Sequence, residues 1–398
     1  MRMLLYAASL VASLLAGSES GALAQSAMQD LKAKAERVIS PITANKDDRL
    51  QEVARFDHQV TGVTVSEDGR IFVSFPRWSE DVAVSVAEVL KDGTIKPYPN
   101  DEWNIWRNLN MASVTPNDHF VCVQSVVADG RGSLWIVDPA APNSEKAIKD
   151  GPKLIQVDLK SDAVKRTYAF GPDIAGPASY LNDVRLSPDG KFAYMTDSGV
   201  PGGLVVVNLD NGNAWRVLSG DSSTQFEKDV TVVVDGKPLR RPDNRQPLFN
   251  ADGIALSPDG KTLYWQALTG KTLYRIGTDV LQAAAERPTA AKAEEVATTE
   301  PVDGLWINKA GKLFLSSIGN NAIKSLNASG AMRTELTDSR LRWPDTFAEG
   351  PDGSLYVTAS HIQDSPWFHP AGWTDKNFTL FKFKPDVPTV GENFGRAR

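Results

Sequence analysis

The chain has 398 residues, of which 41% are hydrophobic and 23% charged, and it contains 30 Gly, 24 Pro and a single Cys. This composition is that of a globular protein, and it excludes disordered, collagen-like and coiled-coil chains. The net charge of −6 provides no general attraction to nucleic-acid phosphates or anionic lipids. We therefore expect small molecules or proteins as partners, and neither nucleic acid nor a membrane.

The N-terminal residues predict a secretory leader. Arg2 precedes an uncharged stretch over residues 3–17, and residues 22–24 (ALA) form the small-x-small pattern that signal peptidase accepts. About 15 apolar or small residues are too few to span the ~30 Å hydrocarbon core of a bilayer. We predict a signal peptide over residues 1–24, a helical lead-in over residues 25–50, and a secreted or periplasmic mature chain.

The rest of the chain repeats one pattern six times. Each copy is an apolar strand, a glycine-centred turn, and a second strand with an aromatic residue three or four places after the turn. The turn glycines are Gly69, Gly132, Gly190, Gly260, Gly311 and Gly353. Their average spacing of about 57 residues lets six copies fill residues 51–390 and leaves no room for a second domain. We predict an all-β fold, a six-bladed β-propeller.

The uneven spacing of the turn glycines predicts long connections between some blades. Three stretches are candidates: residues 139–152, 219–250 and 283–300. The third is rich in Ala and Glu, which predicts some helix.

One register position carries an oxygen-bearing side chain in every copy. The residues eight places before the turn glycines are Thr61, Gln124, Asn182, Asp252, Asp303 and Asp345. Because the innermost strands of a propeller begin around its central channel, we expect these six side chains, the ring residues, to converge at one channel mouth. The simpler interpretation is that they open each strand as turn or Asx-type caps. Three carboxylates at one mouth would repel one another, however, which favours a functional role.

The chemistry of the ring residues suits a cation. Carboxylate, amide and hydroxyl oxygens are the ligands of a hard ion such as Ca²⁺ or another divalent cation, and the lack of His and Cys at this register argues against zinc. A cationic amine would satisfy the same oxygens. We therefore expect a ligand, a metal ion or both at this mouth, and no sequence feature defines an oligomeric state.

Aromatic residues and one histidine complete the candidate site. Trp306 and Trp343 lie close to strand ends and are predicted to bind ligand, although packing within the blades is the simpler role for a Trp. His361 opens a proline-containing segment over residues 361–373 and is a candidate general acid or base. Serine-hydrolase, zinc-protease, Walker and dinucleotide motifs are missing, so we expect no nucleotide or organic cofactor and no covalent Ser or Cys catalysis.

Several runs of sequence resemble the major royal jelly protein/yellow family. They are residues 69–78 (GRIFVSFPRW), 97–99 (PYP), 134–138 (LWIVD), 252–258 (DGIALSP), 273–275 (LYR) and 343–347 (WPDTF). The resemblance implies a secreted six-bladed propeller, and the chain looks like a bacterial, dopachrome tautomerase-related member because it lacks the paired cysteines of insect relatives. Members of the family are linked to dopachrome conversion, to binding of biogenic amines, or to nutritive and structural roles.

A more distant similarity is to gluconolactonase and regucalcin-type propellers. Their metal site draws a Glu, two Asn and an Asp from the starts of the inner strands, and Asn182, Asp252 and Asp303 occupy comparable positions here. The similarity thus implies these three residues as metal ligands, while Thr61 replaces the Glu of the first blade.

Three functional hypotheses follow. In the enzyme hypothesis, Asp252 and Asp303 hydrolyse a lactone with the help of a divalent cation, or move a proton in a dopachrome-type tautomerisation. In the binding hypothesis, the acidic ring and the Trp residues hold a biogenic amine or another small ligand without turnover. The third hypothesis is an interaction scaffold.

Overall fold

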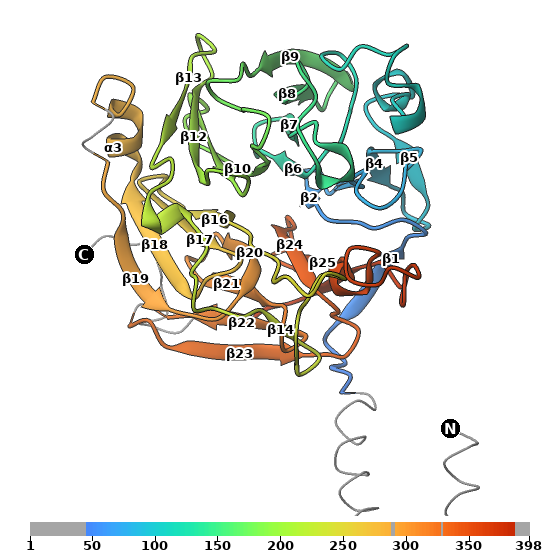
Figure 1. Ribbon diagram of the computed structural model, residues 1–398, viewed down its shortest axis with the longest axis vertical. Coiled ribbons are helices and arrows are strands. Elements are labelled where there is room, and N and C mark those ends of the chain that lie inside the picture. The colour runs from blue at the N-terminus through green and yellow to red at the C-terminus, as the bar shows by residue number, and fades with distance from the viewer. Residues whose placement is uncertain (1–44, 288–290, 328, 387–398) are drawn as a thin grey trace, which may run out of the picture. The chain divides into compact units, whose positions relative to one another are not determined.

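The computed structural model describes residues 45–287, 291–327 and 329–386 (Figure 1). The predicted signal peptide and most of the predicted lead-in lie outside these residues, and residues 45–50 contain a turn but no helix. Asp47–Arg398 form one compact unit, which contains the whole of the sheet structure described below. In the described part of the chain, no helix has the length and apolar character needed to cross a membrane.

Six four-stranded antiparallel sheets surround a central axis, which confirms the predicted six-bladed β-propeller (Figure 1). The first blade contains β2 (Val63–Val65), β3 (Ile71–Ser74), β4 (Val86–Val89) and β5 (Ile95–Pro97). The second contains β6 (Ser125–Ala128), β7 (Ser133–Asp138), β8 (Lys153–Asp158) and β9 (Ala163–Ala169). The third contains β10 (Leu181–Leu186), β11 (Phe192–Asp197), β12 (Gly203–Asn208) and β13 (Ala214–Val217).

The remaining blades follow in chain order. The fourth contains β16 (Ala251–Leu256), β17 (Thr262–Ala267), β18 (Thr272–Gly277) and β19 (Glu294–Thr298). The fifth contains β20 (Val302–Ile307), β21 (Leu313–Ser317), β22 (Ala322–Leu326) and β23 (Met332–Thr337). The sixth contains β24 (Pro344–Glu349), β25 (Leu355–Ala359), β26 (Thr379–Phe383) and β1 (Gln51–Arg55).

The ring closes through the sixth blade. Its outermost strand, β1, comes from the start of the described chain and pairs antiparallel with β26, so that Gln51 lies opposite Lys382 and Arg55 opposite Thr379. A closed ring leaves only short protected edges, which stabilises a propeller without disulfides. The repeat count alone could not assign this strand, because it lies before the first repeat in sequence and in the last blade in space.

The hydrophobic core is divided among the contacts between neighbouring blades. Between the third and fourth blades, for example, Tyr194, Val206, Ile254, Trp265 and Ile276 form one cluster in which each residue is at most 3% exposed. Large apolar side chains point from one sheet to the next because the middle strands are covered on both faces. A seventh cluster lies away from the blade contacts and packs beneath the long connections on one face.

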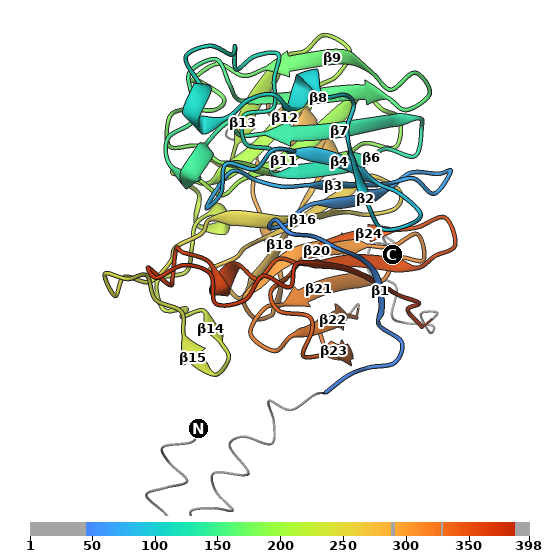
Figure 2. The same cartoon turned by 90° about the vertical axis from the view of Figure 1, so that its right-hand side faces the viewer.

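These long connections gather on the face that begins the inner strands (Figure 2). Residues 219–250 form an excursion as predicted, with the 3-10 helix η4 (Ser222–Thr224) and the hairpin β14 (Val233–Val234) and β15 (Lys237–Pro238). The other short helices are η1 (Glu102–Asn104), η2 (Asn108–Asn110), η3 (Pro142–Ser144), α3 (Thr278–Ala283) and η6 (Ile362–Asp364). The prediction for residues 283–300 is corrected: α3 ends where this stretch begins, and β19 within it is the half-exposed outer strand of the fourth blade.

Candidate active site

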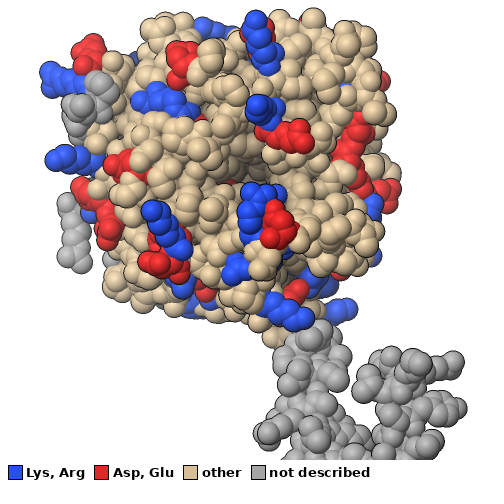
Figure 3. All heavy atoms as spheres, in the orientation of Figure 1, with Lys and Arg blue, Asp and Glu red and all other residues tan. Residues whose placement is uncertain are grey.

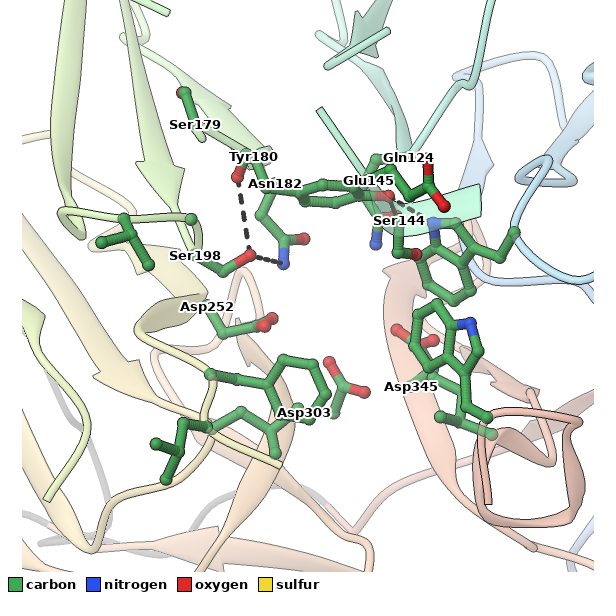
Figure 4. Close-up of a pocket in the computed structure, with 18 of the residues that line it drawn as sticks. Gln124, Ser144, Glu145, Ser179, Tyr180, Asn182, Ser198, Asp252, Asp303 and Asp345 are labelled. Atoms are coloured by element: carbon green, nitrogen blue, oxygen red, sulfur yellow. Dashed lines mark hydrogen bonds between the residues drawn. The ribbon is translucent and has the colours of Figure 1, made fainter. Parts of the chain in front are cut away.

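A local irregularity turns four of the ring residues toward the channel. The pairing of each inner strand with its neighbour shifts register across Leu181/Val184, Ala251/Ile254, Val302/Leu305 and Pro344/Phe347. Such a β-bulge leaves residues out of the ladder and re-aims their side chains. The bulges lie at Asn182, Asp252, Asp303 and Asp345, whose side chains converge in Figure 4.

The glycines that follow Asp252 and Asp303 let the inner strands of neighbouring blades approach one another. A Cβ on Gly253 would lie 2.3 Å from the carbonyl oxygen of Asp303, and one on Gly304 would lie 2.0 Å from that of Asp345. Any side chain at these two positions would push neighbouring blades apart. The Asp-Gly pairs therefore bring the carboxyl groups of successive blades together.

The converging side chains form the floor of a cavity of about 220 Å³, which we call the near cavity. Five of the six predicted ring residues line it: Gln124, Asn182, Asp252, Asp303 and Asp345. Its walls are largely aromatic and consist of Trp78, Tyr180, Phe249, Trp343 and Trp367. This face of the propeller is hollowed at its centre (Figure 3). An apolar wall with a few convergent polar groups is the usual form of a small-molecule site.

Thr61, the sixth ring residue, does not line the near cavity, which corrects the prediction of a ligand-binding role. Its hydroxyl donates a hydrogen bond of 3.2 Å to the backbone carbonyl of Gln124 in the next blade. The ladder between β2 and β3 begins at Val63 and does not include Thr61, whose backbone N–H donates to the carbonyl of Ser74. Thr61 therefore remains a contact between blades.

The three carboxyl groups on the floor are forced toward their neutral forms. Burial raises the pKa of Asp252 well above its usual value, and repulsion from Asp303 and Asp345 adds to the effect. Burial likewise raises the pKa of Asp345, with Asp303 as the next contributor, and raises the pKa of Asp303 to about 7. The charges that act most strongly on these groups are those of other aspartates. At neutral pH the floor thus holds protons, or it requires a cation.

Hydrogen bonds give the floor carboxyl groups different environments. The indole Nε1–H of Trp343 donates to Asp303 Oδ2 at 2.6 Å, which opposes the rise in the pKa of Asp303. The proximity of Asp252 and Asp303 favours the protonated form of Asp252 and the ionised form of Asp303. Ser360 donates to Asp345 at 2.9 Å. The protonation of Asp252 and that of Asp303 therefore depend on one another.

The donor set fits a divalent cation in chemical type. Asn182, Asp252 and Asp303 offer only oxygen ligands from amide and carboxyl groups, as hard cations prefer, and the raised pKa values show that positive charge is lacking there. The three floor carboxyl groups are not gathered into a compact triad, however. Among the described residues, the acidic and histidine ligand atoms that lie within 4.8 Å of one another in a group of three belong to His361, Asp364 and Asp375.

His361 lies in this other cluster and does not line the near cavity, which corrects its prediction as an acid or base beside the ring. Its Nδ1 is 3.2 Å from a carboxylate oxygen of Asp364 and 3.6 Å from one of Asp375. Arg342 forms two hydrogen bonds to Asp364, of 2.9 and 3.0 Å, and pairs with Asp235 at 2.9 Å. These contacts connect the segment around η6 with the hairpin of β14 and β15.

The two tryptophans that were predicted to bind ligand line different cavities. Trp343 lines the near cavity and is fully buried. Trp306 instead lines a different cavity at the opposite ends of the inner strands, so its prediction as a ligand-binding residue of the ring is wrong. It lies three residues beyond Asp303 on β20, and a strand rises about 3.3 Å per residue, which carries Trp306 roughly 10 Å along the channel.

The register pattern missed the residues that the loops contribute. Tyr180 donates a hydrogen bond of 2.9 Å to Gln124 Oε1 and accepts one of 2.5 Å from Trp78 Nε1. Ser198 accepts a hydrogen bond of 3.2 Å from Asn182 Nδ2. Arg241, from the excursion over residues 219–250, lies over the ring of Trp367 with 5.8 Å between guanidinium carbon and ring centroid. Only the position of Tyr180, two residues before a ring residue, could have been deduced from the pattern.

Comparison with known proteins places this propeller in a family. The sequence model of major royal jelly proteins matches residues 121–342, which is more than half of the chain. The chain belongs to the major royal jelly protein family. Major royal jelly protein 5 of Apis mellifera is 25% identical over 285 residues, covering 68% of this chain and 44% of that protein. Protein yellow of Drosophila melanogaster is 23% identical over 259 residues, covering 61% and 46%. The chain thus spans about half the length of these relatives.

Solved structures similar to this member of the family share its fold. Regucalcin of Agrobacterium tumefaciens, described as a calcium-binding protein, has a TM-score of 0.51 at 16% identity and covers 87% of this chain and 98% of its own. A gluconolactonase of Xanthomonas campestris has a TM-score of 0.50 at 13% identity and covers 85% and 89%. At these sequence identities, the similarity shows only that the proteins share the propeller fold.

Proposed function

We propose that this major royal jelly family member is an enzyme acting on a small cyclic or aromatic molecule in the near cavity. The observation that carries the proposal is the convergence of the buried carboxyl groups of Asp252 and Asp303 on the floor of the near cavity, where burial raises the pKa of both. Enzymes that transfer protons use a general acid next to a general base. The aromatic walls suit a flat or cyclic substrate.

Two reactions fit this pair. In lactone hydrolysis, Asp303 takes a proton from water, the hydroxide oxygen bonds to the lactone carbonyl carbon, and the ring C–O bond breaks as Asp252 gives its proton to the leaving oxygen. The proton on Asp303 then returns to Asp252. In a dopachrome-type tautomerisation, one carboxylate removes a proton from carbon and the other carboxyl group protonates the carbonyl oxygen.

A divalent cation would replace the proton on this pair in an alternative form of the first reaction. Asn182 and the ionised carboxylates of Asp252 and Asp303 would hold it, it would polarise the lactone carbonyl, and water rather than Asp252 would protonate the leaving oxygen. The gluconolactonase and the calcium-binding regucalcin among the structural neighbours support the metal-assisted hydrolysis, while the resemblance of the chain to the yellow family supports the tautomerisation.

The test is a substrate panel with and without a chelator. Aldonolactones and a cyclised catechol such as dopachrome are offered to the purified chain, first as isolated and then after treatment with EDTA and readdition of Ca²⁺. Turnover of a lactone that EDTA abolishes and Ca²⁺ restores supports metal-assisted hydrolysis. Turnover of dopachrome that EDTA leaves unchanged supports tautomerisation. No turnover of either class contradicts the proposal.

Binding of an amine without turnover is the second candidate. The wall offers aromatic faces to a cation: Trp78 packs against Trp367 and Tyr180, with 5.1 and 6.3 Å between ring centroids, and all three rings line the near cavity. Calorimetric titration with dopamine and serotonin tests it, and heat of binding from an amine in the absence of any turnover would favour this candidate over the enzyme.

We also propose that the chain acts outside the cytosol. The leader-like residues 1–24 support this proposal. N-terminal sequencing of the protein secreted by its source cells would show Gln25 as the first residue, whereas an intact Met1 would contradict the proposal.

A further inference from the structure

A second cavity, of about 230 Å³, lies at the opposite ends of the inner strands. We call it the far cavity. The last residues of β6, β10, β16 and β20 line it, together with the turns that follow them. Its charged lining residues are Arg131, Arg185 and Asp129. None of these residues belongs to the near cavity.

Arg185 on β10 is a buried cation with incomplete partners. Only 6% of the residue is exposed. Its guanidinium donates to the backbone carbonyls of Val184 at 2.7 Å and Leu305 at 2.9 Å, and it forms a long ion pair of 3.5 Å with Asp183. The Nε–H has no hydrogen-bond partner. The long pair with Asp183 thus leaves one donor of this buried guanidinium unsatisfied, whereas such groups normally pair closely with an anion.

Trp306 on β20 is the second donor without a partner. Its ring lies 5.2 Å from the guanidinium carbon of Arg185, and its indole Nε1–H is buried and makes no hydrogen bond. Buried N–H groups in folded proteins are nearly always paired. Two such groups on stacked side chains lining one cavity mark a place where a hydrogen-bond acceptor is needed.

The far cavity contains no free acceptor of its own to meet that need. Asp129 is the acidic residue that lines it, and its carboxylate already accepts hydrogen bonds from Trp135 Nε1 at 3.0 Å and from the backbone N–H groups of Arg131 at 2.8 Å and Ser133 at 3.1 Å. The side chain of Arg131 adds a second guanidinium, which is 34% exposed, pairs with Asp129 at 3.3 Å and donates to the backbone carbonyls of Ser187 and Pro188 at 3.1 Å each. The cavity therefore combines two paired arginines, one of which keeps an unsatisfied Nε–H, with an unsatisfied indole N–H and a carboxylate that is fully engaged.

We propose that the far cavity binds a small oxyanion, a carboxylate or phosphate group, through Arg131, Arg185 and Trp306. Planar guanidinium groups recognise both anions by paired hydrogen bonds, and the indole N–H supplies one more donor. The volume of about 230 Å³ accommodates an anion of the size of phosphate or a small organic acid. This site is independent of the function proposed for the near cavity.

Indole signals provide the direct test. The full chain, with its ten tryptophans labelled with ¹⁵N, is titrated with sodium acetate, sodium phosphate and sodium chloride at matched ionic strength and pH. Trp306→Phe, which keeps an aromatic ring beneath Arg185, assigns the Trp306 signal by its loss. We expect acetate or phosphate to shift this signal saturably while the signal of Trp343 in the near cavity stays in place, and we expect chloride to have no such effect. A response to one anion alone identifies the class of ligand.

Two variants complete the test through anion-dependent thermal stabilisation. Arg131→Gln removes the charge at the edge of the cavity, and Trp306→Phe removes one donor. Each is expected to weaken anion affinity about tenfold, the effect of losing one hydrogen bond to a charged group. The proposal is overturned if neither anion shifts the Trp306 signal, if chloride acts equally, or if both variants bind the anion as tightly as the natural chain.

Discussion

The two mouths of the channel use the same inner strands but opposite chemistry. At the starts of the strands, bulges turn Asp252, Asp303 and Asp345 into a buried floor where burial and mutual repulsion raise their pKa values. At the other ends, the Nε–H of a buried arginine and an indole N–H lack acceptors. One mouth thus has an excess of acid, and the other an excess of donors.

The aspartates of the far-end turns sharpen this comparison. Asp189 and Asp259 belong to turns of the same sequence, Ser-Pro-Asp-Gly, and the pKa of each lies below its usual value. Each accepts a hydrogen bond of 2.6 Å from the Ser hydroxyl two residues before it and another from a backbone N–H. The same residue type is therefore structural where donors surround it and chemically active where carboxyl groups surround it.

The largest expected effect separates these two kinds of aspartate. Asp303→Asn removes the base of the near cavity, and we expect turnover to fall by about 10²–10⁴-fold, the usual contribution of acid–base catalysis. The free energy of unfolding at neutral pH should stay the same or rise, because a buried repulsive carboxyl group is lost. The matched control, Asp259→Asn, should leave turnover unchanged. Steady-state kinetics measure turnover, and urea unfolding measures the free energy of unfolding. Equal turnover in the two variants would argue against a catalytic role for the floor carboxyl groups.

The pH dependence of stability is the next largest effect. The pKa of Asp303 is raised to about 7, so between about pH 4 and 7 the folded chain binds protons more tightly than the unfolded chain. This tighter proton binding raises the free energy of unfolding by an amount of the order of a few kcal/mol below about pH 4. The added stability is lost as the pH rises through about 7. Asp303→Asn should flatten this slope.

Urea unfolding from pH 4 to 8 checks the slope, and added Ca²⁺ extends the experiment. A cation bound by the floor should stabilise the chain at pH 7 and above, where the carboxyl groups are ionised, by about 2.7 kcal/mol when its concentration is 100 times its dissociation constant. His361→Asn is the control for the cluster with Asp364 and Asp375. Loss of the cation effect in this control, but not in Asp303→Asn, would place the ion at His361.

A smaller effect is expected from the tryptophan that contacts the base. Trp343→Phe keeps the aromatic wall but removes the N–H that donates to Asp303 at 2.6 Å. Because this bond favours the carboxylate, its loss should raise the pKa of Asp303 further and move the acidic limb of the pH–rate profile upward by about one unit. Activity at pH 7 should fall about fivefold and recover at higher pH. A uniform loss at all pH values would instead indicate that Trp343 has only a packing role.

The sequence was sufficient for the fold and for most of the floor because both follow the repeat. Apolar strands and turn glycines define six blades, and one register position identified five residues that line the near cavity. Thr61 has the same register but not the same role, because its short side chain donates to the backbone carbonyl of Gln124 and does not reach the near cavity.

The other predictions that the structure corrects concern the direction of side chains along a strand and the residues that loops contribute. Trp306 is near Asp303 in sequence, but the rise of the strand carries it toward the far cavity. His361 was assigned to the site from its residue type, whereas the fold of its segment directs its side chain to Asp364. The wall residues Trp367 and Arg241 are about 125 residues apart in sequence and follow no repeat, so only the folded chain shows that they meet.

The smallest expected effect concerns Arg241, which the loop over residues 219–250 contributes to the near cavity. Arg241 is the cation that lines the near cavity, and among the described residues it makes no ion pair; burial lowers its pKa. With acids on the floor and this arginine in the wall, the cavity suits a substrate that carries a carboxylate at the end remote from the floor. Arg241→Gln should raise KM for such substrates about twofold to fivefold, with kcat and neutral substrates unaffected. Arg240→Gln, at a neighbour that does not line the cavity, should change neither, and an equal loss for neutral substrates would show that Arg241 acts only by shaping the loop.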